Sequence, residues 1–312
     1  MRVHWFAVTV FVGFADFEGG IWPLLGDFLG DLVYTGHGAR SYRQLYKGLS
    51  GSKVYAFPSQ MGRDGSDHVH LELPGDACDC LPPDKMITLF KLLDDYGLRY
   101  TVKRLDIAFD GLSFTPGDVY RAILDGKLNS FANRKSIQFI ESPYEEKDDG
   151  TLGTSTVYVG SGQSLRMLRV YDKRGFTRAE LQFRDERAHI VAVDLFTGQY
   201  DDWDRKGKSH LRQYVEFTEF PEWEAFIDGV ERYSIRIPSA RVVSLEKLTA
   251  WMKNQVACAF YVLQELGGGA YALDLAQIGE RKLKKKTRSR YDVLLQMVAV
   301  DDIDCQLQRA VL

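Results

Sequence analysis

The sequence lacks the features that define several large classes of protein. No stretch approaches the roughly 18 apolar residues of a membrane-spanning helix. There are only four cysteines in 312 residues, and Cys78 and Cys80 are too close together for a CxxC site. We therefore expect reduced cysteines and a cytoplasmic protein. The absence of GxxxxGK[ST] excludes a P-loop ATPase, and no HExxH, zinc-finger or GxSxG pattern is present.

The composition is that of a folded protein whose basic residues are concentrated locally. Apolar residues make up 45% of the chain and charged residues 27%, enough for a sizeable core. The net charge is −3, so any nucleic-acid surface must be local. Residues 160–190 hold seven cations against four anions, and residues 276–290 hold seven against one. Such clusters are expected where a phosphate backbone is bound.

Hydrophobic patterning predicts an α+β fold with a central antiparallel sheet and flanking helices. Strands are expected at 5–13, 52–57, 68–73, 101–110, 136–142, 154–161, 166–173 and 178–186. Helices are expected at 84–96, 116–126 and 187–197. Beyond residue 236 we expect a long helix at 244–266, a basic run at 281–290 and a last helix at 291–300. We therefore expect two parts, a larger sheet-containing domain, 1–238, and a smaller helical C-terminal region, 239–312.

Two expected neighbouring strands carry dense polar faces. Arg169, Tyr171 and Lys173 project from one face of 166–173, opposite Leu168 and Val170. On the next strand Arg178, Glu180, Gln182 and Arg184 alternate with apolar residues. One interpretation is a solvated face with cross-strand ion pairs. The other is an active site in which a tyrosine, cations and a carboxylate converge on a phosphate.

Carboxylates on strand faces suggest a divalent metal. Asp106, Glu180 and Glu72 each lie on the polar face of an otherwise apolar strand. Carboxylate oxygens suit Mg²⁺ or Mn²⁺, which can polarise a phosphate and stabilise a tyrosine oxygen as it loses its proton. Tyrosine needs such help, because its reference pKa is about 10. Any one of these acids could instead be a salt-bridged strand end, and their occurrence with the tyrosine strand favours the metal.

Four segments together resemble the replication initiation factor family. They are HVHLELPGDAC, RLDIAFD, TVYVGSGQSLRMLRVYDK and RAELQFRDERA, in this order. The family comprises rolling-circle initiators of plasmids and filamentous phages, and conjugative relaxases are related to it. The resemblance implies a nicking-endonuclease-like fold and a metal-dependent endonuclease. Such an enzyme nicks and rejoins one strand of an origin through a covalent 5′-phosphotyrosyl intermediate.

The resemblance also implies roles for particular residues. Tyr171 of the R-x-Y-D-K motif would be the nucleophile, and Arg169 and Lys173 would balance phosphate charge. Asp106 and Glu180 would hold Mg²⁺ or Mn²⁺, with Glu72 as the third ligand. The partner would be origin DNA, single-stranded at the nick, together with a host helicase; a homodimer is left open. The basic clusters add expected DNA contacts at Arg166, Arg178, Arg184, Lys284, Lys285, Lys286 and Arg288.

The sequence departs from the family pattern at three places. Gly162 stands where an arginine is usual, LPGDAC replaces LSGxGC, and His4 or a neighbour stands where the first strand usually has an acid. His68-Val69-His70 also matches the histidine–apolar–histidine pattern of the metal site in HUH nucleases. Two alternatives to a replication initiator stay open: a conjugative relaxase with the same chemistry, and a non-catalytic origin-binding protein.

Overall fold

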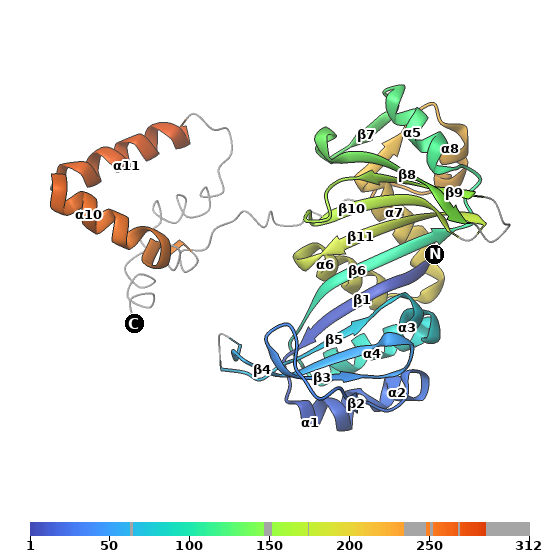
Figure 1. Cartoon of the computed structure of the whole chain (residues 1–312), viewed down its shortest axis with the longest axis horizontal. Coiled ribbons are helices and arrows are strands. Elements are labelled where there is room, and N and C mark those ends of the chain that lie inside the picture. Colours follow the sequence, from blue (N-terminus) through green and yellow to red (C-terminus); the bar gives the residue numbers. More distant parts are fainter. Residues whose placement is uncertain are drawn as a thin grey trace. The chain divides into compact units, whose positions relative to one another are not determined.

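An antiparallel sheet forms the centre of the N-terminal unit of the chain (Figure 1). The computed structural model describes residues 1–62, 65–146, 152–173, 175–233, 248–249, 252–267 and 269–284. Within these ranges the sheet has ten strands, and the predicted α+β class is confirmed. From edge to edge the order is β2 (Val33–Tyr34), β3 (Tyr42–Lys47), β4 (Lys53–Pro58), β5 (Val69–Leu73), β1 (Arg2–Val10), β6 (Tyr100–Asp110), β11 (Phe176–Arg184), β10 (Arg166–Lys173), β9 (Leu152–Val159) and β8 (Ile137–Glu146).

One face of the sheet carries the hydrophobic core. Phe6 of β1 stands opposite Leu73 of β5 and Leu105 of β6, and all three are buried. Helices α4 (Pro83–Asp95) and α6 (Asp185–Phe196) cover this face, since the rings of Phe90 and Phe196 lie 6.0 and 5.9 Å from that of Phe6. Because successive side chains of a strand point to opposite faces, the intervening polar residues lie on the other side of the sheet.

Shorter elements connect the strands. After β1 come α1 (Phe14–Asp16), the π-helical turn η1 (Phe17–Ile21) and α2 (Pro23–Leu29). The 3-10 turn η2 (Leu49–Gly51) precedes β4, α3 (Gly75–Cys80) follows β5, and α5 (Pro116–Leu124) follows β6. A two-stranded sheet pairs β7 (Leu128–Ser130) with β12 (Val215–Phe217). The remaining elements are η3 (Arg134–Ser136), η4 (Tyr200–Asp202), α7 (Trp203–Tyr214) and α8 (Pro221–Ile227).

The chain divides into two compact units, residues 1–235 and 236–312. In the second unit the structure describes a π-helical turn η5 (Met252–Val256), α10 (Ala257–Gly267) and α11 (Gly269–Lys284). The predicted boundary at 238/239, the helix start at Ser244 and the last helix at 291–300 lie outside the described residues and stay predictions. No helix in the described ranges is long and apolar enough to cross a membrane.

Candidate active site

A face of polar side chains lies opposite the core at the centre of the sheet. Strand register brings the side chains of four adjacent strands together. Arg169 of β10 pairs with Glu180 of β11, which pairs with Ala108 of β6. Asp106 of β6 pairs with Gln182 of β11 on one side and with Trp5 of β1 on the other. We call this surface of β1, β6, β11 and β10 the polar face.

Glu180 contacts three polar side chains of the polar face. Its carboxylate is completely buried, and its Oε2 accepts a hydrogen bond of 2.8 Å from the hydroxyl of Tyr171. The Nδ1 atom of His4 lies 3.0 Å from the same oxygen, and the guanidinium of Arg169 pairs with Oε1. Burial opposes ionisation, but His4, Arg169 and Tyr171 together hold the pKa of Glu180 well below its ordinary value. The carboxylate is therefore charged at neutral pH.

Asp106 is the second buried carboxylate of the polar face. Arg104 donates to it from two nitrogens, at 3.0 and 2.6 Å, and the Nε2 of Gln182 donates at 3.3 Å. A nitrogen of Arg169 lies 3.9 Å from its Oδ2, so Arg169 stands between the two carboxylates. Burial, together with the charge of Glu180, raises the pKa of Asp106 despite Arg104. Two carboxylates close together and out of water would favour a cation between them.

His4 reaches Glu180 because β1 is irregular at this point. The register between β1 and β6 shifts between Val3 and Trp5, which leaves His4 as the extra residue of a β-bulge. Gly75 makes room for the imidazole, because a Cβ at that position would lie only 2.8 Å from Nε2 of His4. The sequence assigned His4 no role beyond a departure from the family pattern. The available signal was a histidine inside an otherwise apolar strand.

The hydroxyl of Tyr171 is held in its protonated form. Burial and the neighbouring charge of Glu180 raise the pKa of Tyr171 to about 12, although Arg178 acts in the opposite direction. Arg178 stands opposite Tyr171 in the register and is 1% exposed, and it forms an ion pair with Asp110 of β6. Lys173 lies at the end of the same strand as Tyr171. The phenol therefore needs a further positive charge before it can act as a nucleophile near neutral pH.

Two donors beside Tyr171 have no protein partner in the described part of the chain. Nε of Arg169 and Nη1 of Arg178 are buried N–H donors, and neither donates to a carboxylate or a carbonyl. A buried N–H without an acceptor is costly, so such groups are uncommon in folded proteins. Both belong to arginines whose register places them next to the tyrosine, one on its own strand and one opposite. Phosphate oxygens are suitable acceptors for such donors.

Glu72 lies in a separate cluster, which the structure does not bring together with Asp106 and Glu180. It belongs to β5, and β1 runs between β5 and β6. Its carboxylate accepts a hydrogen bond of 2.9 Å from Tyr55, pairs with Arg40 and lies 3.7 Å from His70. These partners overcome burial and lower the pKa of Glu72 to about 2. The Glu72 position thus repeats the tyrosine, arginine and histidine partners of Glu180.

The donor set suits a divalent cation that is bound incompletely by protein. Asp106 and Glu180 supply hard carboxylate oxygens, and His4 an imidazole. Over the described ranges, no three His, Cys, Asp or Glu side chains are grouped closely enough to hold a metal by themselves. Mg²⁺ is commonly bound by one or two carboxylates, with water and substrate phosphates completing its shell. The two carboxylates fit an ion of that kind.

The predicted DNA-contacting cations occupy different environments. The guanidinium of Arg166 lies 4.7 Å from the centre of the Tyr214 ring, and burial lowers its pKa. Arg184 donates to Gln182 at 3.3 Å at the far end of β11. Arg178 is buried against Asp110, so it contributes to the interior of the site and not to the surface. Lys284 ends α11, and Lys285, Lys286 and Arg288 lie outside the described residues.

Comparison with solved structures indicates the class of fold. A rolling circle replication initiator protein from Geobacillus stearothermophilus aligns with a TM-score of 0.56 and 20% sequence identity. The alignment covers 74% of this chain and 97% of that chain, so the two share a fold. The di-domain ARO/CYC StfQ of the steffimycin biosynthetic pathway aligns with a TM-score of only 0.15. No curated protein matches the chain.

The family follows from the sequence itself. Residues 100–278, more than half of the chain, match the family described as replication initiation factor. The protein therefore belongs to the replication initiation factor family, as its sequence motifs predicted. The matched region contains Asp106, Arg169, Tyr171 and Glu180 but begins after His4 and Glu72.

Proposed function

We propose that the protein initiates rolling-circle replication by nicking one DNA strand, with Tyr171 as the nucleophile. The observation that carries this proposal is the Tyr171 hydroxyl hydrogen-bonded to buried Glu180, between two arginines with unpartnered N–H groups. A strand position fixes the phenol oxygen, as in-line attack on phosphorus requires. The family and the fold support the assignment to replication initiation.

The chemistry is a transfer of the phosphodiester from a sugar oxygen to the tyrosine. The oxygen of Tyr171 attacks phosphorus and loses its proton, the bond to the 3′ oxygen breaks, and that oxygen takes up a proton, so that no net proton is released. The products are a 5′-phosphotyrosyl linkage and a free 3′-hydroxyl. Arg169 and Arg178 would donate to the phosphate oxygens as negative charge develops, and Lys173 would add positive charge at the strand end. Attack by the 3′-hydroxyl on the same linkage reverses the reaction and rejoins the strand.

We further propose that Asp106 and Glu180 hold Mg²⁺ or Mn²⁺, with His4 beside them. When bound there, such an ion would polarise the phosphate and favour the deprotonated form of the tyrosine. The chain's own residues would do the rest: Arg104 and Gln182 orient Asp106, and Arg169 screens the two carboxylates from each other. Glu72 is not included, because β1 runs between its strand, β5, and the strands that carry Asp106 and Glu180.

The substrate would be origin DNA that is single-stranded at the cut site. The direct test is to incubate the protein with labelled single-stranded DNA from its own replicon and Mn²⁺, digest the product, and map the modified peptide. We expect a covalent adduct on the peptide that contains Tyr171. DNA binding without any adduct would instead support a non-catalytic origin-binding protein, and an adduct on another tyrosine would refute the assignment.

A further inference from the structure

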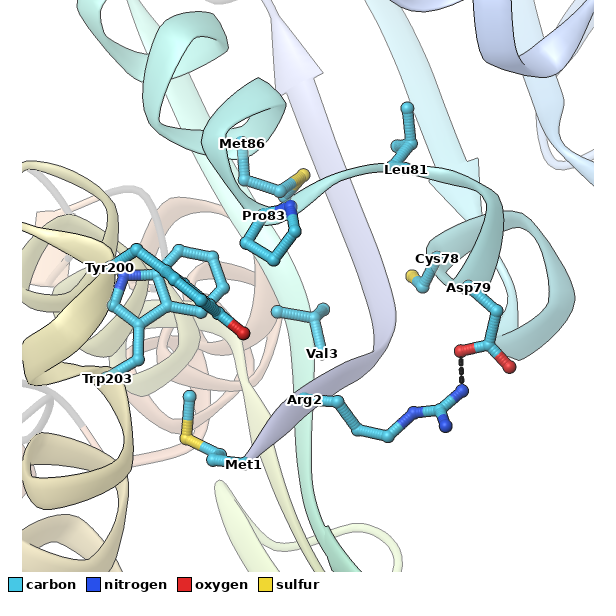
Figure 2. A pocket seen from close by; sticks show the side chains of 10 residues that line it. All are labelled: Met1, Arg2, Val3, Cys78, Asp79, Leu81, Pro83, Met86, Tyr200 and Trp203. Carbon is cyan, nitrogen blue, oxygen red and sulfur yellow. Dashed lines mark ion pairs between the residues drawn. The ribbon is translucent and has the colours of Figure 1, made fainter.

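A pocket of about 380 Å³ opens where β1 begins, outside the polar face (Figure 2). The rings of Tyr200 and Trp203 form one side of it, and Arg2 and Asp79, which form an ion pair, lie on the other. Met86 is among the apolar side chains that complete the lining. The pocket therefore combines an aromatic side, whose two rings stand at 72° to each other, with one group that donates hydrogen bonds and one that accepts them.

Arg2 links this pocket to the candidate active site. Besides its pair with Asp79, its guanidinium lies 3.7 Å from Oδ2 of Asp110. Asp110 in turn holds Arg178, which stands opposite Tyr171 in the register. A continuous series of charged contacts thus leads from the pocket to the tyrosine. A DNA strand lying with its phosphate at Tyr171 would have nearby nucleotides within reach of the pocket.

The lining has the chemistry that a nucleobase requires. Unstacked bases are bound by stacking on aromatic side chains and by hydrogen bonds to the donors and acceptors on their edges. Tyr200 is 45% exposed, while Trp203 beneath it is buried, with the ring centres 5.0 Å apart. Trp203 is held in place by a hydrogen bond from its indole to the carbonyl of Leu195. The exposed tyrosine ring therefore rests on a rigid support.

We propose that this pocket binds one unstacked base of the DNA strand that is cut, and thereby helps to select the phosphate presented to Tyr171. The inference rests on the proposed function, because it requires single-stranded DNA on the polar face. Arg2 and Asp79 would read the edge of the base, and Tyr200 would stack on its face. This is a binding subsite and adds no catalytic residue.

The test is an abasic scan of a bound strand. The probe is a single-stranded oligonucleotide that the wild-type protein selects from a random-sequence pool, with each nucleotide in turn replaced by an abasic site. Affinities are measured for the wild type, for Tyr200→Ala, and for Tyr96→Ala as a control. Tyr96 is 76% exposed but lies at the opposite end of α4 from the pocket. Asp79→Ala is a second test variant, which leaves the aromatic side intact.

The expected result is a loss of affinity at one position that depends on the pocket. The wild type and Tyr96→Ala should lose about 5- to 150-fold when that base is removed. Tyr200→Ala and Asp79→Ala should bind the intact strand more weakly than the wild type does. Removal of the base at that position should then reduce their affinity little further. If both variants show the same loss of affinity as the wild type for each removed base, and DNA is still bound and cut, the pocket inference is wrong while the proposed function stands. If the wild type selects no strand, the proposed function fails with it.

Discussion

Arg169 neutralises two buried carboxylates, so its removal should destabilise the fold measurably. Its guanidinium pairs with Glu180 and lies 3.9 Å from Asp106, and these two side chains are 0% and 1% exposed. Removing one partner of a buried ion pair costs about 3–5 kcal/mol. His4 remains beside Glu180 and Arg104 on Asp106. We therefore expect Arg169→Met to lower the free energy of unfolding by about 3 kcal/mol.

Urea unfolding at neutral pH measures this loss. The surface control is Arg205→Met, whose 66% exposed side chain pairs with Asp202 and should cost less than about 1 kcal/mol. In a Glu180→Gln background the cost of Arg169→Met should fall, since one of the two charges is gone. A loss below about 1 kcal/mol, or an undiminished loss in that background, would refute the view that Arg169 balances these carboxylates.

The same variant tests the proposed metal. Without Arg169, the repulsion between Asp106 and Glu180 is less screened, so a divalent cation should bind the folded protein more tightly. Ligand binding to the folded state raises its stability by mass action. Mg²⁺ or Mn²⁺ should therefore raise the melting temperature of Arg169→Met more than that of the wild type. Equal shifts in both proteins would argue against an ion between these carboxylates.

Three further predictions concern the helices and the basic run. In the capping box of α5, Thr115 and Asp118 form reciprocal hydrogen bonds between side chain and backbone. Thr115→Ala should therefore lower the free energy of urea unfolding by about 1 kcal/mol, whereas the control Thr88→Ala inside α4 should not. Burial opposes ionisation of Asp194, but its contacts with His210, Tyr233 and Lys206 lower its pKa overall. The charged Asp194 therefore contributes fully to the free energy of unfolding above about pH 4, and this contribution is lost as pH falls through the lower folded-state pKa. Asp194→Asn should therefore have a lower free energy of unfolding than the wild type at neutral pH, and the difference between the two proteins should shrink in acid. A difference that does not change with pH would contradict this. The residues of the basic run to be neutralised are Lys284, Lys285, Lys286 and Arg288. Their neutralisation should weaken binding to all DNA sequences and reduce the slope of log affinity against log salt concentration by roughly one unit per lost phosphate contact. An unchanged slope would show that these residues make no phosphate contacts.

Strand identity and facing were the most predictable parts of the site. The expected strand at 166–173 coincides with β10, and Arg169 and Tyr171 share the face that alternation predicted. Because successive side chains of a strand alternate between the two faces of the sheet, the side of every residue is known once one face is known to be buried. The expected strand at 5–13 instead runs over Arg2–Val10, because residues 11–13 form a bend that leads into the helix starting at Phe14. Apolar composition alone did not separate the two.

Strand order and local irregularity could not be predicted in the same way. Alternation placed Glu72 on a polar face but gave no information on which strand lies beside β5. The structure inserts β1 between β5 and β6, so Glu72 has partners of its own. The bulge that turns His4 toward Glu180 depends on the pairing of β1 with β6. Short helices such as α3 and α8 offer too few turns for helical periodicity to be recognised.

The central claim, that Tyr171 is the nucleophile, is tested most directly by Tyr171→Phe. The substitution removes one oxygen from a side chain fixed in β10 and leaves its packing nearly unchanged. Tyr158→Phe is the matched control, because Tyr158 stands opposite Arg169 on the adjacent strand β9. With labelled single-stranded origin DNA and Mn²⁺, Tyr171→Phe should bind DNA but form neither a nick nor a covalent adduct, while Tyr158→Phe forms both. A covalent adduct on the Tyr171→Phe protein would contradict the account.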